Sequence, residues 1–184
     1  MAGPAPAEGP IGVYPGSFDP PTVAHVNLAE QAVAQLGLAR LDLVISHDTL
    51  GKDDAALTAI DERVAALTHL AETRPWLTAG TTPHRLVADI AEGYDAVVIG
   101  ADKWHQLLDP GWYGGTDERD AALRRLPTVA LAPRPPWTIP GEDPAADPPA
   151  GVVVVVLTTD PAHHGVSATA VRAGREDWQA RPDR

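Results

Sequence analysis

Apolar runs of strand length alternate along the chain with segments in which apolar residues recur at helical spacing. The runs cover residues 11–14, 41–46, 76–80, 96–100, 128–132 and 151–158. Helical spacing follows the first run to residue 36, returns over residues 59–72 and predicts a shorter helix over 84–92. Continuous apolar runs are typical of parallel strands buried on both faces. We therefore expect one α/β domain with a doubly wound parallel sheet.

Three segments complete this picture. Residues 1–10 alternate Ala, Pro and Gly, and we expect them to form a mobile tail ahead of a domain over residues 11–184. Residues 133–150 are crowded with prolines and acidic residues, which predicts a proline-rich surface loop that is mobile and has no core residues. The run over 151–158 holds five consecutive valines, and we expect it to be a buried sixth strand.

Composition narrows the function. The 184 residues suit a single domain, and the absence of cysteine excludes disulfides and thiolate metal sites. A net charge of −11 disfavours a nucleic-acid partner, because binding to a phosphate backbone depends on clustered Lys and Arg. With no long apolar run and no charged-then-apolar leader, we expect a cytoplasmic protein without a membrane partner.

The connection between the first strand and the first helix is dense in turn formers. It would bring the backbone N–H groups of Gly16, Ser17 and Phe18, with the positive end of the helix dipole, to the carboxyl end of a strand, which is a place that attracts phosphate. Thr22 and His25 lie three residues apart in the first turn and would project to the same place. In an ordinary connection, Thr22 would only cap the helix and His25 would lie on the surface.

Residues 16–25 read Gly-Ser-Phe-Asp-Pro-Pro-Thr-Val-Ala-His. They resemble the signature loop of the nucleotidyltransferase superfamily that includes nicotinate mononucleotide and phosphopantetheine adenylyltransferases, Gly-x-Phe-Asp-Pro-x-His/Thr-x-Gly-His, with Ala24 in place of its second glycine. The resemblance implies a Rossmann-like nucleotidyltransferase fold. It also implies that the loop binds ATP, with Thr22 and His25 on the α and β phosphates.

A second candidate phosphate site follows the sixth run. Ser167 is placed to cap a helix beginning at Ala168, and Thr169 and Arg172 would share one face of it. A capped helix with an exposed arginine is the simpler interpretation. The stretch resembles the superfamily's second signature, Ile-Ser-x-Thr-x-Ile/Val-Arg, which implies that Ser167, Thr169 and Arg172 hold the β and γ phosphates. Both turns should meet at the carboxyl ends of neighbouring strands.

The fourth run ends in Gly100 and is followed by Asp102, Trp104 and the pair Trp112-Tyr113. Gly100 would let a ribose approach, Asp102 could accept its hydroxyl hydrogens, and Trp104 or Trp112 could stack on a flat ring. Alternatively, Asp102 caps a helix and the tryptophans belong to the core. Gly-x-Asp followed by Trp-Tyr resembles nicotinate mononucleotide adenylyltransferases more than phosphopantetheine enzymes, which typically have Gly-Leu-Arg here.

Three further cations come from the same resemblance. Lys52 lies in the polar segment after the second strand, where the resembled families place a lysine that reaches the phosphates; a solvated loop lysine is the alternative. The usual Pro-Pro-His-Lys run is missing. Arg63, in Asp61-Glu62-Arg63, matches a Glu-Arg helix element, and Arg134-Pro135 matches an Arg-Pro after the fifth strand, which makes Arg134 a candidate substrate ligand.

The resemblance implies adenylyl transfer, in which an acceptor phosphate attacks the α phosphate of ATP in line and pyrophosphate leaves. A phosphate monoester is already anionic, so the catalytic residues His25, Lys52 and Arg172 would position groups and offset charge. Mg²⁺ is expected, held mainly by ATP oxygens and not by a protein metal site.

The acceptor is expected to be nicotinate or nicotinamide mononucleotide, with phosphopantetheine as the alternative within enzymes. A non-catalytic nucleotide-binding regulatory paralogue is the alternative outside them, suggested by Ala24 and the missing Pro-Pro-His-Lys run. A homo-oligomer is compatible with the sequence.

Overall fold

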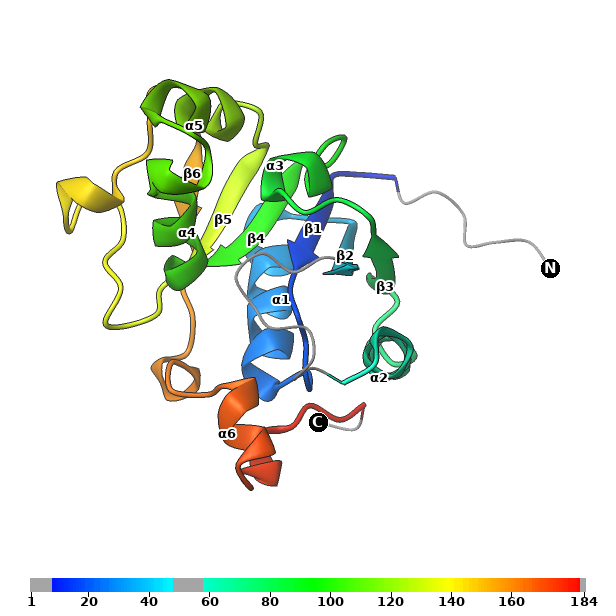
Figure 1. Cartoon of the computed structure of the whole chain (residues 1–184). Helices are drawn as coiled ribbons and strands as arrows, with labels where there is room; N and C mark the ends of the chain where they lie inside the picture. Colours follow the sequence, from blue (N-terminus) through cyan, green and yellow to red (C-terminus); the bar gives the residue numbers. More distant parts are fainter. Residues whose placement is uncertain (1–7, 48–57, 183–184) are drawn as a thin grey trace.

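The computed structural model describes residues 8–47 and 58–182. Six parallel strands form one sheet in the order β3-β2-β1-β4-β5-β6 (Figure 1). Their bounds are Ile11–Pro15 for β1, Arg40–Ser46 for β2, Leu77–Thr82 for β3, Ala96–Gly100 for β4, Thr128–Ala132 for β5 and Val154–Val156 for β6. The predicted doubly wound parallel sheet is confirmed. Strand order reverses between β1 and β4, where such sheets bind ligands.

The helices cover both faces of this sheet. On one face lie α1 (Val23–Leu36) and α2 (Ile60–Ala71), and on the other lie α3 (Val87–Ile90), α4 (Ala101–Leu108) and α5 (Thr116–Leu123). Helix α6 (Ala168–Arg172) follows β6. The sequence analysis did not predict α5, because only Leu123 in it is buried and it therefore shows no apolar stripe. Within the described residues, no helix has the length and apolarity needed to cross a membrane.

Alternation along the strands divides the core into two clusters. In β1, Val13 packs toward α3 and α4, while the next residue, Tyr14, packs toward α1. In β4, Val97 and Ile99 join the α4 side, and Val98 joins the α1 side. Successive side chains of a strand point to opposite faces, so the apolar runs supply both clusters at once.

Strand β6 corrects one expectation. It spans three residues at the edge of the sheet, and Val153, Val155 and Val156 are 59%, 38% and 37% exposed. The predicted sixth strand is confirmed, but it is shorter than residues 151–158, and the prediction that it is buried is wrong for these valines, although Val152 and Leu157 beside it are buried. Branched residues favour a strand whether or not it is covered, so a run of valines indicated the strand but not its burial.

The proline-rich segment 133–150 is tied to the core through Ala146. This residue lies in the short helix η3 (Pro144–Ala146), is fully buried, and accepts a hydrogen bond of 2.8 Å from Trp104 Nε1 through its carbonyl. The prediction that the segment has no core residues is wrong. The predicted tail over residues 1–10 lies mostly outside the described residues, which begin at residue 8.

Candidate nucleotide site

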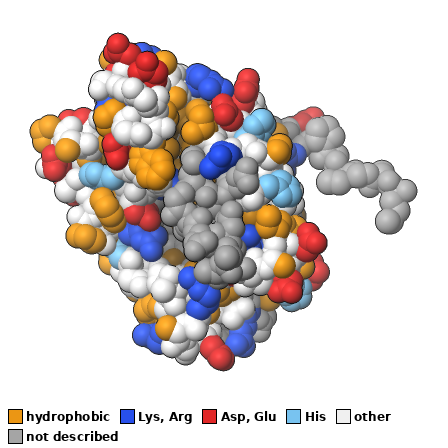
Figure 2. Space-filling view, viewed as in Figure 1, with side chains coloured by type: hydrophobic (Ala, Val, Ile, Leu, Met, Phe, Trp, Pro, Cys, Tyr) orange, Lys and Arg blue, Asp and Glu red, His pale blue; other side chains and the backbone are white. Residues whose placement is uncertain are grey.

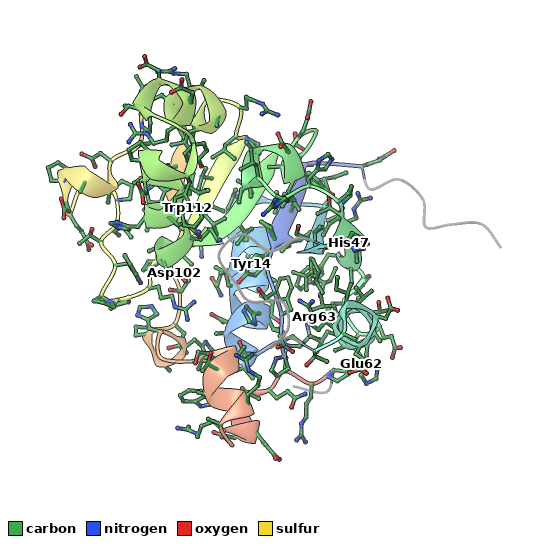
Figure 3. All side chains as sticks on the ribbon, in the orientation of Figure 1. Tyr14, His47, Glu62, Arg63, Asp102 and Trp112 are labelled. Atoms are coloured by element: carbon green, nitrogen blue, oxygen red, sulfur yellow. The ribbon has the colours of Figure 1, made fainter. Side chains whose placement is uncertain are left out.

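A cavity of about 540 Å³ lies at the carboxyl ends of β1, β2, β4 and β5. Most of the predicted site residues line it: Gly16, Ser17, Phe18, Thr22, His25, Gly100, Asp102, Trp112, Arg134, Ser167, Thr169 and Arg172. In Figure 3, Asp102 and Trp112 lie on one side of Tyr14, toward α4, and Arg63 lies on its other side, toward α2. Lys52 lies outside the described residues. Residues from elements and loops that are far apart in the chain thus meet at one edge of the sheet.

The prediction that Trp104 could contact a substrate is wrong. Its side chain is fully buried in the cluster under α4, its indole N–H is bonded to the Ala146 carbonyl, and it does not line the cavity. It cannot stack on a ligand there. From the sequence alone, a tryptophan on the apolar stripe of α4 could belong to the core or contact a ligand. In the structure its packing places it in the core.

The loop after β1 is organised around Phe18. Its ring is 2% exposed and packs edge-on against Tyr14 and His25, at centroid distances of 5.3 and 5.1 Å. A Cβ atom at Gly16 would lie 2.7 Å from this ring, so the position requires glycine. Phe18 itself has φ of +44°, an uncommon conformation that the packing of its ring holds in place.

One expectation for this loop is wrong. The N–H of Gly16 is not free, because it donates to the Val44 carbonyl at 3.0 Å and so extends the pairing of β1 with β2. Gly16 contributes to the site by making room for Phe18 and not by offering a donor.

Thr22 and His25 form a capping box at the start of α1. The fully buried Thr22 accepts the His25 backbone N–H through Oγ1 at 3.4 Å, and its own backbone N–H donates to His25 Nδ1 at 2.9 Å. Because Nδ1 accepts, the neutral imidazole carries its proton on Nε2. The simpler interpretation of Thr22 as a cap is therefore correct, and the same contact fixes the ring of His25 in the cavity wall.

Arg172 joins the two signature segments. Its Nη1 donates to the backbone carbonyl of Asp19 and lies 3.4 Å from the Asp19 carboxylate, which is 4% exposed. Its Nη2 donates to Thr169 Oγ1 at 3.2 Å, and Ser167 caps α6 by accepting the Ala170 N–H. The expected meeting of the two phosphate turns is thus present, across 153 residues of chain.

The strands that carry these turns are not neighbours, however, because β4 and β5 lie between β1 and β6. The prediction of neighbouring strands is therefore wrong. The chain after β6 returns to α1, where Gln35 and Thr158 exchange hydrogen bonds of 2.8 and 2.9 Å. The short helix η4 (Pro161–His163) and α6 follow, and this return brings α6 to the loop after β1.

Arg63 supports the phosphate loop from α2 (Figure 3). The residue is 5% exposed, and its guanidinium donates to the Ser17 carbonyl at 2.9 Å and to the Thr58 carbonyl at 2.8 Å. The sequence analysis identified Arg63 only as part of a motif. A signal for its burial was present, because Arg63 falls at helical spacing with Ile60, Leu67 and Leu70 on the apolar stripe of α2.

The α4 side of the cavity carries an ion pair. Arg134 Nη1 lies 3.5 Å from Asp102 Oδ2, and both side chains are 42% exposed. A Cβ atom at Gly100 would lie 2.6 Å from Asp102 Oδ1, so glycine allows the carboxylate to fold back over the strand end. Burial raises the pKa of Tyr14 well above its ordinary value, with Arg134 opposing the rise and Asp102 adding to it, so the phenol stays neutral.

Part of the remaining wall is apolar, with Leu86, Val87 and Ile90 from the α3 side and Ile99 and Leu107 from the α4 side. Trp112 lines it with 46% of its surface exposed, in the short helix η2 (Pro110–Trp112). Within residues 8–47 and 58–182, no group of three or more His, Cys, Asp or Glu side chains is arranged to hold a metal.

A doubly wound sheet with two helix-start turns joined at the carboxyl ends of its strands is typical of α/β proteins that bind nucleotides. The sequence profile of the cytidylyltransferase-like family matches residues 13–174. The chain therefore belongs to this family, within the nucleotidyltransferase superfamily that its motifs resemble.

Individual relatives agree with this assignment. A probable nicotinate-nucleotide adenylyltransferase of Listeria monocytogenes is 29% identical over 116 residues, which cover 56% of this chain and 61% of that protein. One of Listeria innocua is 36% identical over 64 residues, covering 35% and 34%. The chain thus spans about three-fifths or less of the length of these relatives.

Solved structures share the fold. Plasmodium falciparum nicotinic acid mononucleotide adenylyltransferase, complexed with APC, superposes with a TM-score of 0.64 at 14% identity, over 90% of this chain and 83% of that one. The same enzyme complexed with NaAD gives 0.60 at 15% identity, over 89% and 82%.

Proposed function

We propose that the protein is an adenylyltransferase that transfers AMP from ATP to the phosphate of nicotinate or nicotinamide mononucleotide and releases pyrophosphate. The observation that carries the proposal is the contact between Arg172 and Asp19, which brings His25, Ser167 and Thr169 of the two signature segments to the wall of one cavity. The cavity is also large enough for more than one small-molecule group.

The chain's own residues would act by positioning and by neutralising charge. His25, with its proton on Nε2, would donate to an oxygen of the reacting phosphate, and Arg172 would face the departing pyrophosphate. Ser167 and Thr169 would bind the far phosphates. No general base is needed, because the acceptor phosphate is already ionised. Mg²⁺ bound to the ATP oxygens would supply further charge neutralisation.

The pyridine mononucleotides are favoured as acceptors by the other end of the cavity. Asp102 stands at the end of β4 where it could accept ribose hydroxyl hydrogens, and Trp112 offers a half-exposed indole for stacking on a planar ring. The names of the Listeria relatives and of the Plasmodium enzyme agree with this choice. Phosphopantetheine has no ring of its own for Trp112 to stack on.

Pyrophosphate release from ATP and Mg²⁺ tests the proposal. Nicotinate mononucleotide, nicotinamide mononucleotide and phosphopantetheine would each be supplied in turn, with a reaction lacking acceptor as the control. We expect release with a pyridine mononucleotide. Pyrophosphate release with phosphopantetheine alone would overturn the proposed pyridine mononucleotide acceptor. ATP binding without pyrophosphate release for any acceptor would favour the regulatory paralogue.

A further inference from the structure

Four Lys or Arg side chains among the described residues line the cavity, and three of them are engaged by protein partners. Lys103 Nζ lies 2.6 Å from Gln106 Oε1, Arg134 pairs with Asp102, and Arg172 pairs with Asp19. The fourth is Arg85, which is exposed and has no hydrogen-bond or ion-pair partner among the residues that the structure describes. Of these four side chains, Arg85 is thus the one for which the described residues supply no hydrogen-bond or ion-pair partner.

The backbone that carries Arg85 is nevertheless fixed on both sides. Just before it, the His84 carbonyl accepts the Ser46 hydroxyl at 2.6 Å, and the His84 N–H donates to Thr82 Oγ1 at 3.2 Å. Just after it, the Leu86 carbonyl accepts the N–H groups of the first turn of α3. These hydrogen bonds hold the backbone at Arg85 in place, so its exposed side chain extends from a fixed position in the cavity wall.

The surroundings of this turn define what the guanidinium would meet. Leu86, Val87 and Ile90 follow it and line the apolar part of the cavity, and Val87 and Ile90 share a core cluster with Ile99 and Leu107 of the α4 side. Arg172, Ser167 and His25 instead belong to the phosphate end. Arg85 thus adds a positive charge to the part of the wall that suits a flat, apolar ring. On the face of the molecule that Figure 2 shows, Lys or Arg side chains and hydrophobic side chains both reach the surface.

We propose that Arg85 selects the acceptor by charge, binding a carboxylate carried on the planar ring of the mononucleotide, so that the carboxylate form is preferred over the carboxamide form. The proposal rests on the proposed function. A guanidinium binds a carboxylate through two parallel charge-assisted hydrogen bonds, which a neutral amide cannot match. Because Arg85 is exposed, solvent screening reduces the gain, and we expect a preference of about tenfold.

Direct binding tests the proposal without requiring turnover. Titration calorimetry would measure the dissociation constants of nicotinate mononucleotide, nicotinamide mononucleotide and a non-hydrolysable ATP analogue. The proteins compared would be wild type, Arg85→Gln, Arg85→Lys and Arg181→Gln. Arg181 is an exposed arginine outside the cavity, so its variant removes the same charge elsewhere. Because the Arg85 side chain is exposed and has no hydrogen-bond or ion-pair partner among residues 8–47 and 58–182, we expect its variants to fold as the wild type does.

We expect wild type to bind the nicotinate form about tenfold more tightly than the amide form, and Arg85→Gln to abolish most of this preference. Arg85→Lys should keep part of it, and Arg181→Gln all of it. A preference that survives in Arg85→Gln, or a loss of ATP-analogue affinity in its place, would overturn the role of Arg85 and leave the proposed function standing. Selective binding without pyrophosphate release would support Arg85 and overturn the proposed function. Failure of both mononucleotides to bind would overturn both.

Discussion

The two ends of the cavity are built in different ways. At the proposed phosphate end, the protein's own groups hold one another: the Thr22 backbone N–H donates to His25, Arg172 pairs with Asp19, and Arg63 donates to the Ser17 carbonyl. At the acceptor end, Trp112 and Arg85 are exposed on a wall of aliphatic side chains. A site for transferring phosphate needs its donors fixed in advance. A site that recognises a ring can rely on shape and a few polar contacts.

This difference predicts how substitutions divide between the ends. Changes at the phosphate end should lower the rate of the chemical step, and some should cost stability, because the residues there hold one another. Changes at the acceptor end should mainly raise the Michaelis constant of one substrate. The predictions below would break or sharpen this contrast, from the largest expected effect to the smallest.

His25→Asn is expected to lower turnover by roughly a hundredfold or more, because a fixed donor to a phosphate oxygen is worth a few kcal/mol in the transition state. The asparagine Oδ1 can still accept the Thr22 N–H, so the capping box should survive with little change in the melting temperature. Steady-state kinetics and thermal unfolding measure the two effects. Wild-type turnover in this variant would return His25 to the status of a cap residue.

Arg172→Met should reduce turnover by about ten- to a hundredfold, because it removes a cation from the phosphate end and leaves the Asp19 carboxylate without its partner. Arg172→Lys keeps the charge but cannot form the guanidinium contacts with both Asp19 and Thr169. We expect it to recover only part of the rate. Full recovery would show that charge alone matters and that the link between the two signature segments does not.

Arg63→Met is expected to lower the free energy of unfolding by about 1–3 kcal/mol, since two carbonyls lose a buried charged donor. The rate should also fall by about tenfold, because the phosphate loop loses its support from α2. Chemical denaturation and kinetics on the same samples give both values. The exposed substitution Arg124→Gln is the control, for which neither value should move appreciably. A stable variant of full activity would mean that Phe18 packing alone fixes the loop.

Trp112→Ala should raise the Michaelis constant for the mononucleotide by up to about tenfold, more than that for ATP, because one stacking contact is removed and the phosphate contacts remain. Its melting temperature should change little, since 46% of the side chain is already exposed. Kinetics with each substrate varied in turn provide the measurement. If only the Michaelis constant for ATP rises, Trp112 contacts the adenine of ATP and not the acceptor.

The phosphate end was largely predictable because its chemistry lies in short contiguous segments. Residues 16–25 and 167–172 each carry their own turn, cap and helix start, so local spacing indicated where Thr22, His25, Ser167 and Arg172 would lie. Their roles toward a ligand stay predictions. The acceptor end was harder to predict from the sequence. Trp112 was identified through its motif, whereas nothing in the sequence around Arg85 distinguished it from any other loop arginine.

The sequence by itself determined the alternation of strands and helices, the doubly wound sheet and the two signature turns, because apolar periodicity and turn chemistry are local properties. The tertiary structure decided burial and partnership. Whether Trp104 is core or contact, whether five valines are covered or lie at an edge, and which carbonyls Arg63 holds all depend on segments distant in the chain. Burial is set by what packs against a residue, and a residue's own neighbours in sequence do not specify that.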